Sequence, residues 1–277
     1  MDETFGERLR ARLLDAGPLC VGVDPSREVV RAWEREDTVE GLEYVALTTL
    51  EATVGEAAVI KCQVAFFERF ASRGFRVLER VISEAHAAGL IVIADAKRGD
   101  VGSTNEGYAQ AWLEDESPLC VDAVTLSPFL GVGALAPVFQ RADATNRGLF
   151  VLVATSNPEG RTLQSARSAQ HERVESMVFR EVAERNADRD TLGNFGVVLG
   201  ATRERPDFDL RALKGPYLVP GVGAQGASPT DVARLFEGCV EGSVTINVAR
   251  AILAAGPEPR AVRDALRRWR DELRDVL

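Results

Sequence analysis

The stretch Ile91–Asp100, with the sequence IVIADAKRGD, is an apolar run of strand length that leads directly into two carboxylates and two cations. In a β-strand, side chains at positions i and i+2 lie on the same face, so Asp95 and Lys97 are expected to point in the same direction. The stretch therefore predicts a buried strand that carries an Asp-Lys pair at its carboxyl end.

Similar apolar runs recur along the whole chain and alternate with stretches of helical spacing. The predicted strands cover residues 19–24, 58–63, 90–95, 122–127, 149–155, 195–201, 217–221 and 243–248. Predicted helices include residues 39–54, 75–88, 104–113, 174–186, 230–236 and 260–276. Eight strand-helix units in 277 residues fit an α/β fold of the (β/α)8 (TIM) barrel type better than a doubly wound sheet, which normally needs fewer strands. We therefore expect one domain over residues 1–277.

Three segments fit the alternation less well. Residues 157–170 are polar with few apolar anchors, so they are expected to form a long loop after a strand. Residues 201–215 hold too little apolar surface for a full helix. Residues 2–16 resemble a short amphipathic helix, and we expect residues 1–17 to cover the bottom of the barrel. Loops at the opposite, C-terminal end are the ones that hold substrates in this fold.

Composition restricts the classes of function. The net charge of -9 argues against nucleic-acid binding through a broad basic face, because that contact neutralises phosphates. The longest apolar runs, such as residues 90–94 and 149–154, are too short to cross a bilayer. The start, Met1–Thr4, lacks the basic and apolar regions of a signal peptide, so a cytoplasmic location is expected.

The cysteines and histidines form no recognisable metal or redox motif. The four cysteines lie far apart and are expected to be buried free thiols: Cys20, Cys62, Cys120 and Cys239. His86 and His171 lie in helix-like stretches without a partner at metal-ligand spacing, and we expect both to be solvated. The sequence therefore predicts no metal site and no Ser-His-Asp triad.

Two further predicted strands carry charged residues to the same end of the barrel. The first strand ends at Asp24, and the second contains Lys61. Of 33 basic residues only three are lysine (Lys61, Lys97 and Lys214), and arginine cannot replace lysine as a proton donor. We expect four charged groups to meet at one mouth, facing a ligand. The alternatives are that Asp24 caps a turn, that Lys61 lies on the surface, and that Asp95 and Lys97 form a structural salt bridge.

The stretch Tyr217–Gly226, YLVPGVGAQG, is a predicted strand that opens into a glycine-rich turn. Glycine lets backbone amides approach a phosphate, and the side chain of Gln225 can donate a hydrogen bond. The spacing also matches a dinucleotide-binding motif, but that motif follows a first strand and needs an acidic residue where this chain has Asn247. We therefore expect a phosphate cradle between the seventh and eighth strands, with Arg250 as its cation unless Arg250 lies on a helix surface.

Together these motifs resemble the orotidine 5′-phosphate decarboxylase family, and more closely its longer bacterial and archaeal branch (type 2). The resemblance covers nearly the whole chain in the following stretches: Val21–Pro25, Lys61–Gln63, Asp95–Asp100, Leu152–Pro158, Pro220–Gln225 and Ala249–Arg250. It implies a (β/α)8 barrel that removes CO2 from orotidine 5′-monophosphate (OMP) to give uridine 5′-monophosphate (UMP), the last step of UMP biosynthesis, without a cofactor. The Asp-x-Lys-x-x-Asp core is specific in this setting, although related sugar-phosphate lyases share it.

The resemblance also implies a role for each matching residue. Lys97 looks like the acid that protonates C6 of the pyrimidine, with Asp95 beside the leaving carboxylate and Lys61 completing the charged array. Asp100, also catalytic, and Thr104 are implied to reach the site of a neighbouring subunit, which implies a homodimer. The remaining implied contacts are Asp24 with the ribose, Ser156 with the pyrimidine edge, Gln225 and Arg250 with the phosphate, and Pro220 and Ala249 with the substrate.

The role implied for Lys97 is physically reasonable, because an ammonium group aimed at a developing carbanion lowers the barrier before it donates a proton. Three alternatives stay open. One is a magnesium-dependent lyase of the 3-hexulose-6-phosphate synthase or keto-gulonate-phosphate decarboxylase type, which has a glutamate where this chain has Lys61. The others are an aldolase that forms a Schiff base at Lys97, and a non-catalytic sensor that binds UMP.

Overall fold

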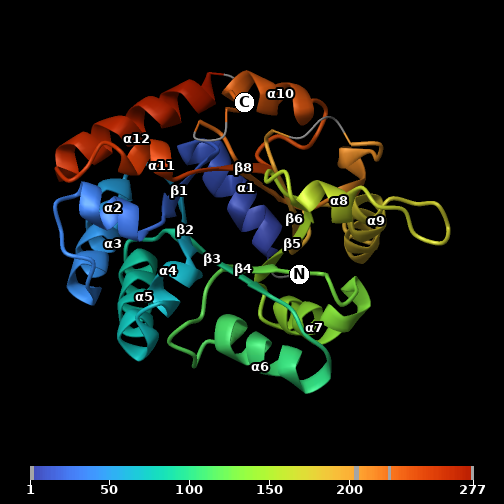
Figure 1. Ribbon diagram of the computed structural model, residues 1–277. Coiled ribbons are helices and arrows are strands. Elements are labelled where there is room, and N and C mark those ends of the chain that lie inside the picture. Colours follow the sequence, from blue (N-terminus) through green and yellow to red (C-terminus); the bar gives the residue numbers. More distant parts are fainter. Residues whose placement is uncertain (1–2, 203–205, 224–225, 276–277) are drawn as a thin grey trace.

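In the computed structural model, which describes residues 3–202, 206–223 and 226–275, eight parallel strands form a closed barrel ringed by helices (Figure 1). The strands are β1 (Leu19–Val23), β2 (Val59–Gln63), β3 (Ile91–Arg98), β4 (Ala123–Leu126), β5 (Gly148–Ala154), β6 (Phe195–Leu199), β7 (Tyr217–Pro220) and β8 (Val244–Val248). The ring closes where β1 pairs with β8, with Cys20 opposite Asn247. The predicted (β/α)8 barrel is confirmed, and β3 extends three residues beyond its predicted end.

Helices connect the strands along the outside of the barrel. The described helices are α1 (Phe5–Ala16), α2 (Arg27–Ala32), α3 (Val39–Thr53), α4 (Val64–Glu68), α5 (Ala71–Ala87), α6 (Gly102–Leu113), α7 (Ala136–Ala144), α8 (Gly160–Gln164), α9 (Val174–Arg185), α10 (Pro229–Leu235), α11 (Arg250–Leu253) and α12 (Pro259–Arg274), with the 3-10 helices η1 (Val132–Leu135) and η2 (Leu210–Leu213). The loop expected at 157–170 thus contains the short helix α8, and residues 201–215 contain η2. None of the helices in the described part of the chain is long and apolar enough to span a membrane.

Local sequence signals explain where helices begin. The side chain of Thr38 accepts a hydrogen bond from the backbone N–H of Gly41 at the start of α3. Ser228 and Asp231 form a reciprocal capping box at the start of α10, and Pro229 occupies the first turn, where its missing N–H costs nothing. These polar caps satisfy backbone donors that a helix leaves unpaired, so the helices begin close to their predicted positions.

The helix α1 closes the bottom of the barrel, and Figure 1 shows it lying across the middle of the ring of strands. Its residues Phe5, Leu9 and Leu13 are buried in one cluster with side chains from the barrel interior. The rings of Phe5 and Phe150 meet edge to face at 6.1 Å. Gly148 makes room for this contact, because a Cβ there would lie 2.2 Å from the Phe5 ring. A ligand therefore has access to the interior from the opposite end.

The interior changes from apolar to polar toward the C-terminal ends of the strands. On β2, Val59 belongs to the bottom cluster, whereas Lys61 and Gln63 lie two and four residues further toward the mouth. On β3, Ile93 lies in the same cluster, and Asp95 pairs in register with Gln63. Strand alternation on an apolar base therefore places a layer of polar side chains at the mouth.

Candidate active site

A cavity of about 270 Å³ lies at the C-terminal ends of the strands, above the apolar filling. Its lining residues are Asp24, Lys61, Gln63, Asp95, Lys97, Leu152, Thr155, Ser156, Asn157, Val198, Leu218, Pro220, Gly221, Val222, Asn247, Ala249 and Arg250. The C-terminal ends of β1 to β3 supply a charged wall, which consists of Asp24, Lys61, Asp95 and Lys97. Apolar surface comes from β5 to β7, through Leu152, Val198 and Leu218. A concavity that combines apolar surface with convergent polar groups is typical of small-molecule sites.

Asp95 stands at the centre of the charged wall and accepts four hydrogen bonds. Its Oδ1 accepts from Lys97 Nζ at 2.6 Å and from Thr125 Oγ1 at 2.9 Å. Its Oδ2 accepts from Lys61 Nζ at 3.0 Å and from Gln63 Nε2 at 3.1 Å. Burial by itself raises the pKa of Asp95, but the charges of Lys61 and Lys97 outweigh it and hold that pKa well below the ordinary value. Asp95 is therefore an oriented carboxylate at neutral pH.

Lys61 lies between two carboxylates, 3.0 Å from Asp95 Oδ2 and 3.8 Å from Asp24 Oδ1. Its side chain is only 4% exposed, so the surface alternative for Lys61 is wrong. Burial lowers the pKa of Lys61, but Asp95 and Asp24 raise it to a net value above the ordinary one. For Asp24, burial raises the pKa and Lys61 only partly opposes this. Among the described residues, Asp24 Oδ1 is buried and has no hydrogen-bond donor, while Asp24 as a whole lines the cavity.

Lys97 reaches Asp95 through a β-bulge rather than by regular alternation. The register of β3 on β4 shifts from Ala94 opposite Val124 to Arg98 opposite Leu126. Within this bulge Lys97 adopts a left-handed backbone conformation, with φ of 48°. Its side chain is 43% exposed, against 11% for Asp95. Of the charged wall, Lys97 is therefore the cation with the better access to a ligand.

Two of the predicted site residues do not line the cavity of their own chain. Asp100 follows β3 and is half-buried, and Thr104 is exposed on α6. The loop at Asp100 is fixed by the buried Asn105, whose Oδ1 accepts from Asp100 N at 3.0 Å and whose Nδ2 donates to Asp100 O at 2.5 Å. Asn105 thus holds the backbone of Asp100 after the end of β3, and Asp100 does not line the cavity that contains Asp95.

The predicted phosphate cradle lies at the far side of the mouth from Lys97's strand. Gly221 lines the cavity, and both Gly221 and Gly223 have positive φ, of 104° and 74°, which favours glycine. Gln225 lies outside the described residues. Arg250, the first residue of α11, lines the same cavity. These positions bring glycine backbone and a guanidinium group to one end of the cavity.

Pro220 and Ala249 also line the cavity, at the ends of β7 and β8. A Cβ at Gly22 would lie 2.4 Å from the Cβ of Ala249, so glycine on β1 permits the turn after β8 to approach. Ser156 lines the cavity from the loop after β5. That loop is held by α8, because Gln164 Oε1 accepts from the backbone N–H of Thr155 at 3.0 Å. The structure therefore brings the C-terminal ends of β7 and β8 and the loop after β5 to one cavity.

Sequence reasoning gave no role to three polar residues near the charged wall. Gln63 stands two residues after Lys61, so strand alternation alone could have placed it on the same face. Asn247 lines the cavity from β8, two residues after the buried Thr245. Thr125 on β4 had no comparable signal, because its contact with Asp95 depends on how β3 and β4 pair.

The structure also shows the surroundings of the cysteines and histidines. All four cysteines are thiols outside any disulfide; Cys239 is half-buried, and the other three are buried. His86 is exposed, as expected, and its Nε2 also lies 3.1 Å from Asp122 Oδ2, within hydrogen-bonding distance. His171 is exposed. In the part of the chain that the structure describes, no group of three or more His, Cys, Asp or Glu side chains is placed to hold a metal ion.

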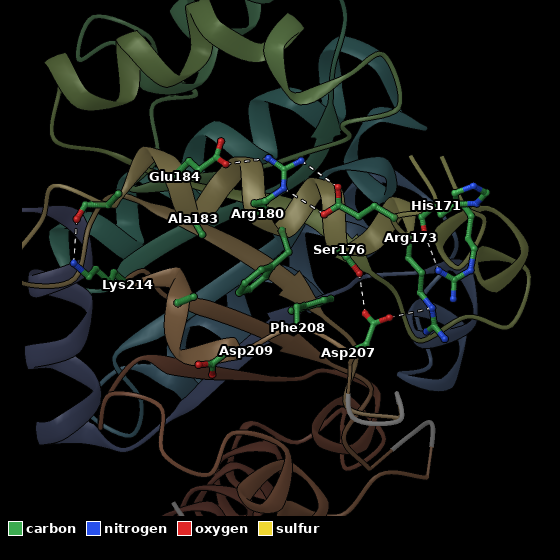
Figure 2. A pocket seen from close by; sticks show the side chains of 15 residues that line it. His171, Arg173, Ser176, Arg180, Ala183, Glu184, Asp207, Phe208, Asp209 and Lys214 are labelled. Carbon is green, nitrogen blue, oxygen red and sulfur yellow. Dashed lines mark hydrogen bonds and ion pairs between the residues drawn. The ribbon is translucent and has the colours of Figure 1, made fainter. Parts of the chain in front are cut away.

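A larger hollow of about 820 Å³ lies outside the barrel, between α9 and residues 207–214 (Figure 2). Phe179 and Phe208 stack at its base with ring centroids 4.3 Å apart. Its charged side chains pair with one another on the surface, as Arg180 does with Glu172 and Glu184. Such exposed pairs contribute little energy and do not converge on a ligand, so the mouth of the barrel is the better candidate site.

The chain is similar to known proteins over nearly its whole length. A family model described as "Orotidine 5'-phosphate decarboxylase / HUMPS family" matches residues 17–265. Orotidine 5′-phosphate decarboxylases of Salinispora arenicola and Streptomyces coelicolor are 48% and 46% identical to this chain, over 99% of each chain. A crystal structure from Streptomyces avermitilis, assigned to the same activity, is 46% identical with a TM-score of 0.94 and covers 99% of this chain and 96% of its own. The chain therefore belongs to the orotidine 5′-phosphate decarboxylase family of carboxy-lyases.

Proposed function

We propose that the cavity at the barrel mouth decarboxylates OMP to UMP, the last step of de novo UMP biosynthesis, with Lys97 as the proton donor and without a metal or other cofactor. The main support is the placement of Lys97, which lines the cavity and has its Nζ 2.6 Å from Asp95 Oδ1. No nucleic-acid or membrane partner is needed for this reaction, and a cytoplasmic location stays a prediction.

The charged wall supplies what the bond cleavage needs. When the bond between C6 and the carboxylate carbon breaks, its electron pair stays on C6 and CO2 leaves. The ammonium group of Lys97 stabilises that negative charge and then transfers a proton to C6, which forms the C–H bond of UMP. Asp95 holds Lys97 in place throughout. Because Asp95 is fixed by four donors, it does not need to reorganise as the charge develops.

The position of Lys61 favours this reading over a magnesium-dependent lyase. Its buried ammonium lies 3.0 Å from Asp95 and 3.8 Å from Asp24, in the place that a divalent cation would need in order to bridge those carboxylates. A Schiff-base aldolase is also disfavoured. Its nucleophile must be an amine that is free to attack a carbonyl, whereas Lys97 Nζ is engaged with Asp95 Oδ1 at 2.6 Å.

The proposed substrate contacts follow the geometry of the cavity. Asp24 would accept from a ribose hydroxyl, because it lines the cavity and its side chain is 20% exposed. Arg250 would pair with the phosphate, beside the glycine-rich turn that includes Gln225, and Ser156 would bind the pyrimidine edge from the β5 loop. Pro220 and Ala249 would shape the walls between these contacts.

We also propose that two copies of the chain form a dimer with shared sites. Asp100 and Thr104 lie beside the mouth but outside their own cavity. The neighbouring loops carry two exposed apolar residues, Val101 and Phe129, and Phe129 is 74% exposed. The loops adjoin each other, since Ser127 N donates to Arg98 O at 2.8 Å. Exposed apolar residues beside Asp100 and Thr104, which do not line their own cavity, support a second copy of the chain as the partner.

The first experiment follows the loss of OMP absorbance by the purified protein after treatment with a chelator. We expect activity to persist after chelation and to fall by two or more orders of magnitude, roughly, in Lys97→Ala. Lys214→Ala is the matched control, because Lys214 Nζ binds backbone oxygens of Ala187 and Arg189 away from the cavity. Activity that vanishes with the chelator or survives in Lys97→Ala would contradict the mechanism. UMP binding without turnover in the wild type would indicate a sensor.

Mixing two inactive variants tests the shared site. In a heterodimer of Lys97→Ala and Asp100→Ala subunits, one of the two sites combines an intact Lys97 with an intact Asp100. Random exchange makes half of the dimers mixed, so about a quarter of the wild-type activity should return. Recovery of no activity, in a sample shown by light scattering to have exchanged subunits, would contradict a shared site.

A further inference from the structure

We propose that Thr125 is a positioning residue for the decarboxylation, acting through both Asp95 and Lys97. Thr125 lies on β4 and is completely buried. Its Oγ1 donates to Asp95 Oδ1 at 2.9 Å and accepts from the backbone N–H of Lys97, also at 2.9 Å. It does not line the cavity, so it acts on the substrate only through its two neighbours. This inference rests on the proposed role of Lys97.

The chemistry of its partners fixes the direction of both hydrogen bonds of Thr125. The backbone N–H of Lys97 can only donate, so it fixes Thr125 Oγ1 as the acceptor of that bond. The carboxylate of Asp95 can only accept, so the hydroxyl proton of Thr125 points to Oδ1. Asp95 Oδ1 is the same atom that accepts from Lys97 Nζ at 2.6 Å. One hydroxyl group therefore connects the main chain of Lys97 to the carboxylate that holds its side chain.

The backbone conformation of β3 explains why the N–H of Lys97 pairs with the side chain of Thr125. The bulge in β3 moves Lys97 out of the regular β3–β4 ladder, so its N–H binds the side chain of Thr125 instead of a strand carbonyl. Lys97 is also held at φ of 48°, a conformation that a non-glycine residue adopts only when its surroundings enforce it. Thr125 supplies one such restraint, because an unpaired N–H next to a buried threonine would be costly.

The expected effect of removing the hydroxyl is on the chemical step rather than on binding. A small rotation of Asp95 or a relaxed bulge would move Lys97 Nζ away from the position where negative charge develops, and such misplacement lowers kcat. The phosphate end of the cavity, at Gly221 and Arg250, is built by β7 and β8 and does not depend on β4. Binding of UMP should therefore persist.

Thr125→Val removes the hydroxyl with little change of shape, and Thr125→Ser retains it. We expect Thr125→Val to lower kcat roughly 10- to 100-fold, the loss that corresponds to one hydrogen bond to a charged group. Its KM for OMP and its Kd for UMP should stay within about threefold of the wild type, and Thr125→Ser should restore most of kcat. Thr245→Val is the matched control. Thr245 is also a fully buried threonine on a barrel strand, but its Oγ1 has no hydrogen-bond partner among the described residues.

The outcomes separate the two proposals. An inactive wild type would contradict the proposed function, whereas an active wild type with unchanged kcat in Thr125→Val would overturn the positioning role. Equal losses of kcat in Thr125→Val and Thr245→Val would also overturn it, because any buried hydroxyl would then matter equally. Thr125→Ala covers the case in which valine prevents folding. If neither Thr125→Val nor Thr125→Ala binds UMP, Thr125 serves the whole fold and the inference fails.

Discussion

Replacing Lys61 by methionine removes the ammonium group that lies between Asp95 and Asp24 and keeps an unbranched side chain of similar length. The side chain of Lys61 is only 4% exposed, so water cannot easily take the place of the lost charge. Removing one partner of a buried ion pair typically costs about 3–5 kcal/mol, because the remaining charge is left uncompensated. For a domain of this size that corresponds to a melting temperature lower by roughly 6–20 °C.

The pH dependence of this loss has a definite sign. In the wild type the pKa of Asp95 is lowered on folding, so the carboxylate stabilises the native state above its ordinary pKa of 3.8, and this contribution is lost as the pH falls toward the folded value. Without Lys61, the pKa values of Asp95 and Asp24 both rise. Their protonation at lower pH then relieves the uncompensated charge. The stability deficit of Lys61→Met should therefore be largest at neutral pH and shrink on acidification.

Urea unfolding at pH 7.5 and pH 5 measures this deficit directly. Arg80→Met is the matched control, because Arg80 also pairs with two carboxylates, Glu43 at 2.8 Å and Glu84 at 2.7 Å, but is 54% exposed. Exposed pairs contribute little to stability. A deficit in Lys61→Met no larger than that of Arg80→Met, or one that grows as the pH falls, would refute the reasoning.

Three further changes test other parts of the structure. Arg250→Ala should raise KM for OMP about tenfold or more, with a smaller effect on kcat at saturation, because it removes a proposed phosphate contact; steady-state kinetics measures both. Gly148→Ala places a Cβ 2.2 Å from the Phe5 ring, so urea unfolding should show a loss of about 1–3 kcal/mol while kcat is unchanged. Burial raises the pKa of Cys62 to about 12, so a thiol reagent should modify the half-buried Cys239 in the native protein and Cys62 only after unfolding, as mass spectrometry can show.

The barrel could be predicted because its strands are short apolar runs with clear boundaries. The run that ends in Asp95 and Lys97 is such a case, and so is the strand that leads into Pro220 and Gly221. Parallel strands all end at the same mouth, so the charged residues at their ends could be expected to meet. This simple geometry was enough to place Asp24, Lys61, Asp95 and Lys97 in one cavity.

The local geometry around Lys97 could not be predicted in the same way. The sequence has no glycine at position 97 to signal a left-handed residue, and regular alternation alone predicts that Lys97 lies on the same face as Asp95. The bulge depends on pairing with β4, some thirty residues later in the chain. For the same reason the contact of Thr125 was not foreseen, although Gln63 was within reach of the alternation rule.

The described ends of the chain both lie on the face of the barrel that α1 closes. The last turn of α12 meets the end of α1 there, where the Arg274 side chain donates to the backbone oxygen of Asp15. A fusion partner, affinity tag or solid support attached at either end would therefore sit beneath the barrel. Molecules diffusing toward Lys97 would meet an unobstructed opening, so immobilising the protein through its termini should leave its turnover unchanged.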